Sequence, residues 1–209
     1  ALKPYVVDVV SRYANDDRVL VWDLFNEPDN TSANSYGPLE LKNKDEMASR
    51  LVRRAFEWAR SAGPSQPLTV GLWRMENWHQ PESLNETHRA AVELSDVISF
   101  HDYAKPEVTQ RRIDELKTYG RPLFCTEFMA RAMGSSFEEA LPLFKQENVA
   151  AYCWGLIDGK SQTKYPWHTW QMPILGEPDP WHHDIFHADG RPYRDSEVQL
   201  IRELTGRGG

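Results

Sequence analysis

Two glutamates stand at positions from which carboxylates could act together on one substrate. Glu27 follows the apolar run at residues 19–25, and Glu127 follows another at residues 122–126. Both runs predict β-strands. Carboxylates at the carboxyl ends of separate parallel strands reach the same edge of a sheet, and such a pair can cleave a glycosidic bond without a metal or a cofactor. Glu27 and Glu127 are therefore the candidate catalytic pair.

The elements that would hold this pair alternate between strand and helix. Strands are expected at residues 19–25, 67–72, 96–100, 122–126 and 149–154, and helices at residues 4–14, 39–61, 84–94, 107–119, 136–147 and 195–204. This alternation is typical of an α/β fold with a parallel sheet and crossover helices. A closed eight-stranded barrel has three more strands and usually about 250 residues. We therefore expect either a (β/α)8 TIM-type barrel that lacks strands 1–3 and keeps strands 4–8, or an open doubly wound sheet.

Two segments carry further structural expectations. In the helix at residues 39–61, helical spacing predicts a buried stripe made of Met47, Leu51, Ala55, Trp58 and Ala59. Residues 156–192 form a connection that is too long for a simple link and is rich in Trp and His. Long structured loops of this kind usually line a site.

Length and charge limit the classes of function. A chain of 209 residues can bury a sizeable core, and residues 1–209 are expected to form a single catalytic-domain portion. The net charge of -7 is spread along the chain without a Lys/Arg cluster, which argues against a nucleic-acid partner. No apolar run approaches the roughly 18 residues of a membrane span, and no basic-then-apolar leader is present. The compartment stays open, with an extracellular or periplasmic location as the default.

Cysteine and histidine usage favours neither a disulfide framework nor a metal site. The two cysteines, Cys125 and Cys153, are too few for either and are expected to be free thiols. The histidines at positions 168, 182 and 183 lack the helical spacing of zinc ligands, so a structural loop role is expected for them. No glycine-rich phosphate loop or nucleophile elbow is present. We therefore expect no metal and no cofactor.

The residues that follow the expected strands form a chemically coherent set. They are Asn26 and Glu27, then Trp73 and Arg74, then His101 and Tyr103, then Glu127, and finally Trp154. Ligands of parallel α/β folds bind at the carboxyl ends of the strands. A sugar ring has polar edges and an apolar C–H face that stacks on an indole, so carboxylates, hydrogen-bonding groups and flat aromatic faces suit it.

This set resembles the second half of a retaining glycoside hydrolase of clan A, close to the family 5 cellulase-like enzymes. Members carry Asn-Glu-Pro after barrel strand four and a nucleophilic Glu after strand seven, which match Asn26-Glu27-Pro28 and Glu127 with two expected strands between them. The family's His-x-Tyr after strand six matches His101 and Tyr103, and its Trp after strand eight matches Trp154. Strands one to three of the family, which supply an Arg and further sugar-binding groups, have no counterpart here.

The resemblance implies a role for each matched residue. Glu27 would be the acid/base and Glu127 the nucleophile of a double displacement, with their carboxyl groups about 5 to 5.5 Å apart and retention of anomeric configuration. As an acid, Glu27 must hold a proton at working pH, which requires burial or a nearby negative charge. By strand parity Tyr103 shares a face with His101, and its hydroxyl would orient Glu127. Asn26 would bind the sugar 2-hydroxyl, and Trp154 would form the floor of the cleaved sugar's subsite.

Structural alternatives stay open for the binding residues. Asn26 could cap the following turn, and His101 could be a hydrogen-bonded core histidine. Trp154, taken alone, is typical of a core. Three further tryptophans are open between sugar stacking and loop packing: Trp73, Trp167 and Trp170.

The family resemblance implies hydrolysis of a β-linked oligo- or polysaccharide, with β-glucan as the default. A competing interpretation is a catalytically inactive carbohydrate-binding or scaffold fragment. Its open sheet edge at residues 19–25 would pair with a second copy or with a separate amino-terminal half of the barrel. A third interpretation is a flavodoxin-like ligand binder with coincidental glutamates.

Overall fold

The computed structural model describes residues 2–31, 36–73 and 77–206. The chain divides into two compact units. Unit 1 comprises Ala1–Phe100 and Asp114–Leu123, and unit 2 comprises His101–Ile113 and Phe124–Gly209.

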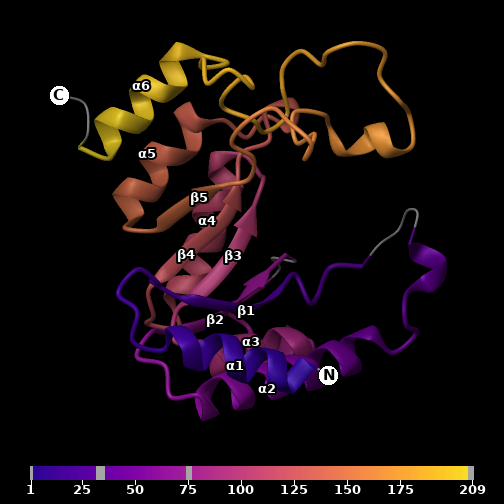
Figure 1. Cartoon of the computed structure of the whole chain (residues 1–209), viewed down its shortest axis with the longest axis vertical. Coiled ribbons are helices and arrows are strands. Elements are labelled where there is room, and N and C mark those ends of the chain that lie inside the picture. Colours follow the sequence, from indigo (N-terminus) through magenta and orange to yellow (C-terminus); the bar gives the residue numbers. More distant parts are fainter. Residues whose placement is uncertain (1, 32–35, 74–76, 207–209) are drawn as a thin grey trace. The chain divides into compact units, whose positions relative to one another are not determined.

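Strands and helices alternate along the described residues (Figure 1). The strands are β1 (Trp22–Asn26), β2 (Leu68–Leu72), β3 (Ile98–Asp102), β4 (Leu123–Phe128) and β5 (Ala150–Cys153). The α-helices are α1 (Leu2–Tyr13), α2 (Lys44–Ser61), α3 (Glu86–Leu94), α4 (Pro106–Lys117), α5 (Phe137–Glu147) and α6 (Asp195–Leu204). The sheet has the strand order β1-β2-β3-β4-β5, and the pairs β1–β2, β2–β3 and β4–β5 are parallel. The expected α/β fold with parallel strands is confirmed.

Unit 1 is built around β2, all five residues of which are buried. Helix α2 contributes Val52 and Phe56 to its core, and α3 contributes Ala90 and Ala91. A parallel strand that is buried on both faces has to be mostly apolar, as β2 is. Its one hydroxyl, that of Thr69, is satisfied because it donates to the Val97 carbonyl at 2.7 Å. Burying a Val or Phe side chain contributes roughly 1.5–3 kcal/mol. The core therefore fixes β2, and β1 pairs with it in parallel, with an irregularity in the register between Asp23 and Asn26.

Unit 2 has an aromatic core between β4 and α5. The ring of Phe128 meets those of Phe137 and Phe144 edge-on, with centroids 5.6 and 5.2 Å apart. Edge-to-face pairs of this kind add about 0.5–1.5 kcal/mol beyond the burial of their area. Because Phe128 directly follows Glu127, this packing anchors the end of the strand that carries the expected nucleophile.

The element boundaries differ from the expected ones in two instructive places. The first strand begins at Trp22 instead of residue 19, because the Val19 N–H donates to the Asp16 carbonyl at 3.0 Å in a turn. The second helix begins at Lys44 instead of residue 39, because Gly37–Leu39 form a separate 3₁₀ turn. Helix α6 has the expected bounds.

The expected buried stripe of α2 is partly wrong. Ala55 and Ala59 are buried, but Met47 is 40% exposed, and the core face is taken by Val52 and Phe56. Successive helical residues are rotated by about 100°, so a core face displaced by one position turns Met47 outward. Met47 instead lines a groove of about 800 Å³ within unit 1.

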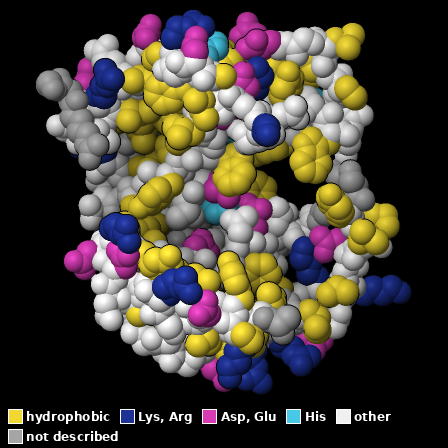
Figure 2. All heavy atoms as spheres, viewed as in Figure 1, with side chains coloured by type: hydrophobic (Ala, Val, Ile, Leu, Met, Phe, Trp, Pro, Cys, Tyr) yellow, Lys and Arg dark blue, Asp and Glu magenta, His cyan; other side chains and the backbone are white. Residues whose placement is uncertain are grey.

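The described residues have a surface of mixed charge and two free thiols. Among the described residues, no helix is long and apolar enough to cross a membrane. Figure 2 shows Lys and Arg side chains interspersed with Asp and Glu on the visible face. Cys125 and Cys153 are free, as expected, and burial raises the pKa of both thiols.

Candidate active site

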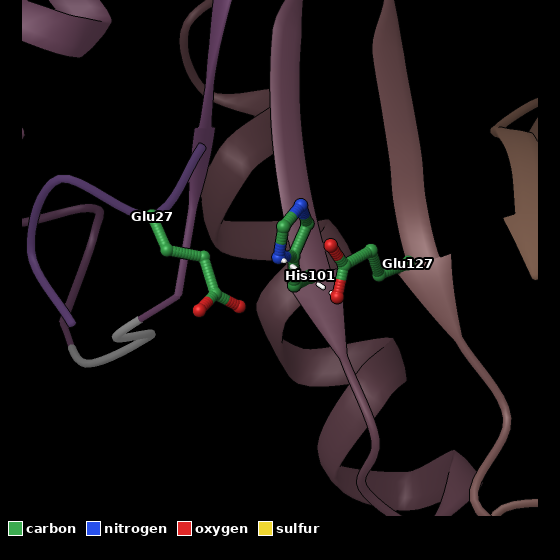
Figure 3. Close-up of side chains that lie close together, drawn as sticks. All are labelled: Glu27, His101 and Glu127. Atoms are coloured by element: carbon green, nitrogen blue, oxygen red, sulfur yellow. Dashed lines mark ion pairs between the residues drawn. The ribbon is translucent and has the colours of Figure 1, made fainter. Parts of the chain in front are cut away.

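In unit 2, His101 at the end of β3 and Tyr103 just after it both contact Glu127 on β4. Figure 3 shows His101 beside Glu127. The Tyr103 hydroxyl donates a hydrogen bond of 2.7 Å to Oε2 of Glu127. His101 Nδ1 lies 3.4 Å from the same oxygen. His101 and Tyr103 are 2% and 7% exposed, so both contacts are shielded from water. The expected bond between Tyr103 and Glu127 is present.

Asp102, between these two residues, points to the other side of the strand and holds the turn that follows it. Its Oδ1 accepts the Ala104 N–H at 2.8 Å and Nη1 of Arg112 at 2.7 Å. The carboxylate is buried, and this burial raises the pKa of Asp102 against the opposing effect of Arg112. The bond to Ala104 spans Tyr103, so it limits the backbone freedom of the residue that orients Glu127.

The aromatic-rich loop packs against Tyr103 within unit 2. Trp167 meets the Tyr103 ring edge-on with centroids 4.9 Å apart, and the His183 ring lies 5.6 Å from it. Nδ1 of His183 donates to the Met129 carbonyl at 2.6 Å, and Met129 holds a left-handed φ of 76° just after β4. The loop therefore supports both Tyr103 and the backbone that follows Glu127.

The buried histidines of this loop are neutral packing residues. His182 and His183 are each 1% exposed. Burial lowers the pKa of His182 to about 3 and also lowers the pKa of His183. A protonated imidazole would be costly at these positions, in line with the structural loop role expected for them.

In unit 1, the segment after β1 carries Glu27, which is labelled in Figure 3. Its N–H donates to the Gly71 carbonyl at 2.8 Å, and its φ of 46° is left-handed. Nδ2 of Asn30 donates to Oε2 of Glu27 at 2.6 Å. A left-handed non-glycine residue is strained and persists where its surroundings hold it, which is typical of functional sites.

The next turn is held by Asp29, which is 8% exposed. Its Oδ1 accepts the Trp73 N–H at 3.0 Å, and its Oδ2 lies 3.0 Å from Nε2 of His88 on α3. These contacts join the chain ends of β1 and β2 to a helix. Glu27 therefore projects from a segment that is fixed on both sides.

The remaining candidate residues have different environments. Asn26 is exposed at the end of β1, and Trp73 is half-buried after β2. Trp154 follows β5, is 43% exposed and donates its N–H to the Phe128 carbonyl at 3.2 Å. Its exposure argues against the alternative of a core tryptophan. Arg74 lies outside the described residues.

Sequence reasoning missed three supporting residues: Asn30, Asp29 and Asp102. Asn30 and Asp29 follow Glu27 within three positions, and Asx residues commonly bond to nearby groups in turns, which is a usable signal. Asp102 alternates with His101 and Tyr103 along one strand, so parity assigns it to the opposite face. Its partner Arg112 lies on α4, and no local pattern indicates that pairing.

The model of the cellulase family, glycosyl hydrolase family 5, matches residues 1–172. The chain belongs to this family. This membership overturns the flavodoxin-like interpretation. No curated protein matches the family 5 chain.

Solved structures with a similar fold are glycoside hydrolases. One is a family 5 protein from Streptomyces cattleya in complex with Manβ1-4GlcNAc, at 12% identity and a TM-score of 0.62, covering 96% of this chain and 53% of that one. A structure of fungal β-1,4-galactanases has 13% identity, a TM-score of 0.59 and coverages of 97% and 67%. A family 10 endo-β-1,4-xylanase from Gloeophyllum trabeum has 15% identity, a TM-score of 0.54 and coverages of 97% and 66%.

These similarities show the fold of the family 5 chain, which is that of TIM-barrel glycoside hydrolases. The chain spans between about half and two thirds of the length of these three structures. Five parallel strands alternating with helices are a partial barrel. The expected portion of a (β/α)8 barrel is thus confirmed, and the doubly wound alternative is excluded.

Proposed function

We propose that residues 1–209 are a single catalytic-domain portion of a retaining β-glycoside hydrolase that uses Glu27 and Glu127. The observation that carries this proposal is the pair of contacts on Glu127, to Tyr103 at 2.7 Å and to His101 at 3.4 Å. Two groups aimed at one carboxylate oxygen fix its rotation, as a nucleophile requires. The family supports the reaction class.

In the first step, the Glu127 carboxylate attacks the anomeric carbon while Glu27 gives its proton to the departing glycosidic oxygen. The C–O bond to the leaving group breaks, and an ester between the sugar and Glu127 forms. Asn26 binds the sugar 2-hydroxyl, and Trp73 and Trp154 offer indole faces to sugar rings. The Glu127 negative charge is consumed in this step, so Glu27 becomes a base for the second.

In the second step, water attacks the same anomeric carbon after giving a proton to Glu27. The ester bond breaks, and the electron pair returns to Glu127 as a carboxylate that accepts the Tyr103 hydrogen bond. Two inversions give net retention. In the active protein, the mechanism requires the two carboxyl groups to be about 5 to 5.5 Å apart.

For the substrate, we propose a β-linked oligo- or polysaccharide, with β-glucan as the default. The family and the aromatic and hydrogen-bonding groups that follow the strands support this proposal.

The test uses dinitrophenyl β-glycosides with Glu27→Ala and Glu127→Ala, with and without azide. Because dinitrophenolate leaves without a proton, Glu27→Ala should still form the ester, and azide should release a β-glycosyl azide. In Glu127→Ala, azide should replace the nucleophile and give an α-glycosyl azide. Turnover by the parent with the inverted product anomer, seen by proton NMR, would refute the retaining mechanism.

A second candidate function is an inactive carbohydrate-binding scaffold that needs a partner to complete the barrel. Two observations favour it: β1 is at one end of the strand order, and a groove beside it in unit 1 is lined by the apolar side chains of Phe25, Leu41, Met47 and Leu51. A second copy or an amino-terminal barrel half could cover this edge. Size-exclusion chromatography combined with turnover decides: an active monomer refutes the scaffold, and an inactive dimer supports it.

A further inference from the structure

Two tryptophans of the aromatic-rich loop are exposed without serving as core residues. Trp170 is 71% exposed and Trp167 is 40% exposed. Large apolar side chains that gather at the surface usually mark a binding site. This pair is therefore a candidate binding surface.

The local backbone places both indoles on one side. Trp167 and Trp170 are the first and last residues of a 3₁₀ turn, Trp167–Trp170. A 3₁₀ helix has three residues per turn, so side chains three positions apart are eclipsed, at roughly 6 Å along the axis. That separation is comparable to the length of one sugar ring, so the pair can face two consecutive rings.

The loop around this turn is free of formal charge. Residues 165–176 contain no Asp, Glu, Lys or Arg. Lys164, just before them, forms ion pairs through its Nζ with a carboxylate oxygen of Asp158 at 2.7 Å and one of Glu177 at 3.8 Å. A surface with flat indole faces and no net charge suits a neutral glycan better than a polyanion.

The turn is continuous with the expected nucleophile in unit 2. Trp167 packs edge-on against Tyr103 at 4.9 Å, and Tyr103 donates to Glu127 at 2.7 Å. His182 and His183 back the Trp167 ring at centroid distances of 4.8 and 5.4 Å. Trp167 is thereby fixed, and Trp170 stands at the other end of the same 3₁₀ turn.

We propose that Trp167 and Trp170 form a binding platform for two consecutive sugar rings of a neutral β-linked polysaccharide. The proposal rests on the proposed function for the identity of its ligand, and it makes the substrate a polymer instead of a small glycoside. The platform adds binding energy on sugars beyond the cleaved bond. Trp170 is the residue that tests it, because Trp167 also supports Tyr103.

The experiment measures binding of the full chain in a Glu127→Gln background, so that hydrolysis does not interfere. The probes are soluble β-glucan, glucomannan, xylan and galactan in native affinity gels, with polygalacturonate as the anionic comparison. Trp170→Ala should weaken binding of the preferred neutral glycan about 3- to 10-fold, and Trp170→Tyr should restore most of it. Met172→Ala, at a residue of the same loop that is 66% exposed, should leave binding unchanged.

Three results would overturn the platform. They are the absence of binding to every neutral glycan, equal binding by Trp170→Ala and its parent, and an equal loss in Met172→Ala. A change in oligomeric state in Trp170→Ala without a change in glycan binding would instead assign the surface to protein contact. If the parent protein shows no hydrolysis while glycan binding still depends on Trp170, the proposed hydrolase is refuted and the platform is kept. Failure of the platform and failure of the proposed function are therefore distinguishable.

Discussion

The buried ion pair between Arg131 and Glu197 offers the sharpest test of how unit 2 is held together. Nε and Nη2 of Arg131 donate to the two oxygens of Glu197 at 2.7 and 2.5 Å, and Nη1 donates to the carbonyls of Trp181 and Asp184, both at 3.1 Å. The two charged side chains are 2% and 0% exposed. This cluster joins α6 and the aromatic-rich loop to the segment that follows Glu127.

Replacing Arg131 by Met leaves the buried Glu197 carboxylate without its bidentate partner, with only the half-exposed Arg194, 3.5 Å from Oε1, as a remaining counter-charge. The loss of one partner from such a pair costs about 3–5 kcal/mol, a large part of the 5–15 kcal/mol by which a typical domain is stable. For a chain of this length, about 2–4 °C of thermal midpoint corresponds to each kcal/mol, so the midpoint should fall by about 6–20 °C. Guanidinium unfolding followed by tryptophan fluorescence measures the free energy directly.

The double variant Arg131→Met/Glu197→Leu separates charge burial from lost packing. Because it removes both charges, it should lose less stability than the sum of the two single variants. Arg111→Met, at an exposed position of α4, is the matched control and should change stability by less than about 0.5 kcal/mol. A loss below about 1 kcal/mol in Arg131→Met, or additive single effects, would refute the reasoning.

Three further predictions concern the loop and the site. Gly155→Ala should destabilise the fold by at least about 1 kcal/mol more than Gly190→Ala, as measured by thermal unfolding. Both glycines have a φ of 86°, but only at Gly155 would an added Cβ approach the Cβ of His183 to 2.7 Å. Equal losses of stability in the two variants would contradict this. Because the pKa of His182 is lowered to about 3, the imidazole takes up a proton in the unfolded protein, but not in the folded protein, as the pH falls below about 6.5. The free energy of unfolding should then drop by up to about 1.4 kcal/mol per pH unit down to pH 3. The variant His182→Asn should flatten that slope, and an unaltered slope would argue against a buried neutral imidazole. With dinitrophenyl glycosides, Tyr103→Phe should slow hydrolysis of the glycosyl-enzyme roughly 10- to 100-fold and give a larger burst in stopped-flow absorbance. The reason is the loss of the hydrogen bond from the Tyr103 hydroxyl to the returning Glu127 carboxylate, which is worth about 1.5–3 kcal/mol. An unchanged kcat would exclude that role.

Periodicity predicted the elements well where the local pattern decides the structure. All five expected strands and all six expected helices are present among the described residues, and α6 has the expected bounds. The pattern failed where a turn competes with a strand, as at Val19, whose N–H donates to Asp16. It also failed on α2, where helical spacing allows two adjacent apolar stripes, one with Val52 and one with Met47. Spacing alone does not decide which of them meets the core.

The candidate site was predictable in its residues but not in their contacts. Strand ends and parity selected Glu127, His101 and Tyr103, and the bond between Tyr103 and Glu127 follows from their shared face. The roles of Glu27 and Glu127 in catalysis stay predictions. Arg112 and Glu197 could not be found, because their partners, Asp102 and Arg131, lie 10 and 66 positions away in the chain.

The sequence by itself determined the class of fold, the family resemblance and the residues that follow each strand, since these depend on local periodicity and on short motifs. Only the tertiary structure decided which donors converge on Oε2 of Glu127, which buried charges compensate each other and which tryptophans of the long loop stay exposed. Such pairings depend on where distant segments pack, and burial then makes each unpaired charge or donor costly enough to select a single arrangement.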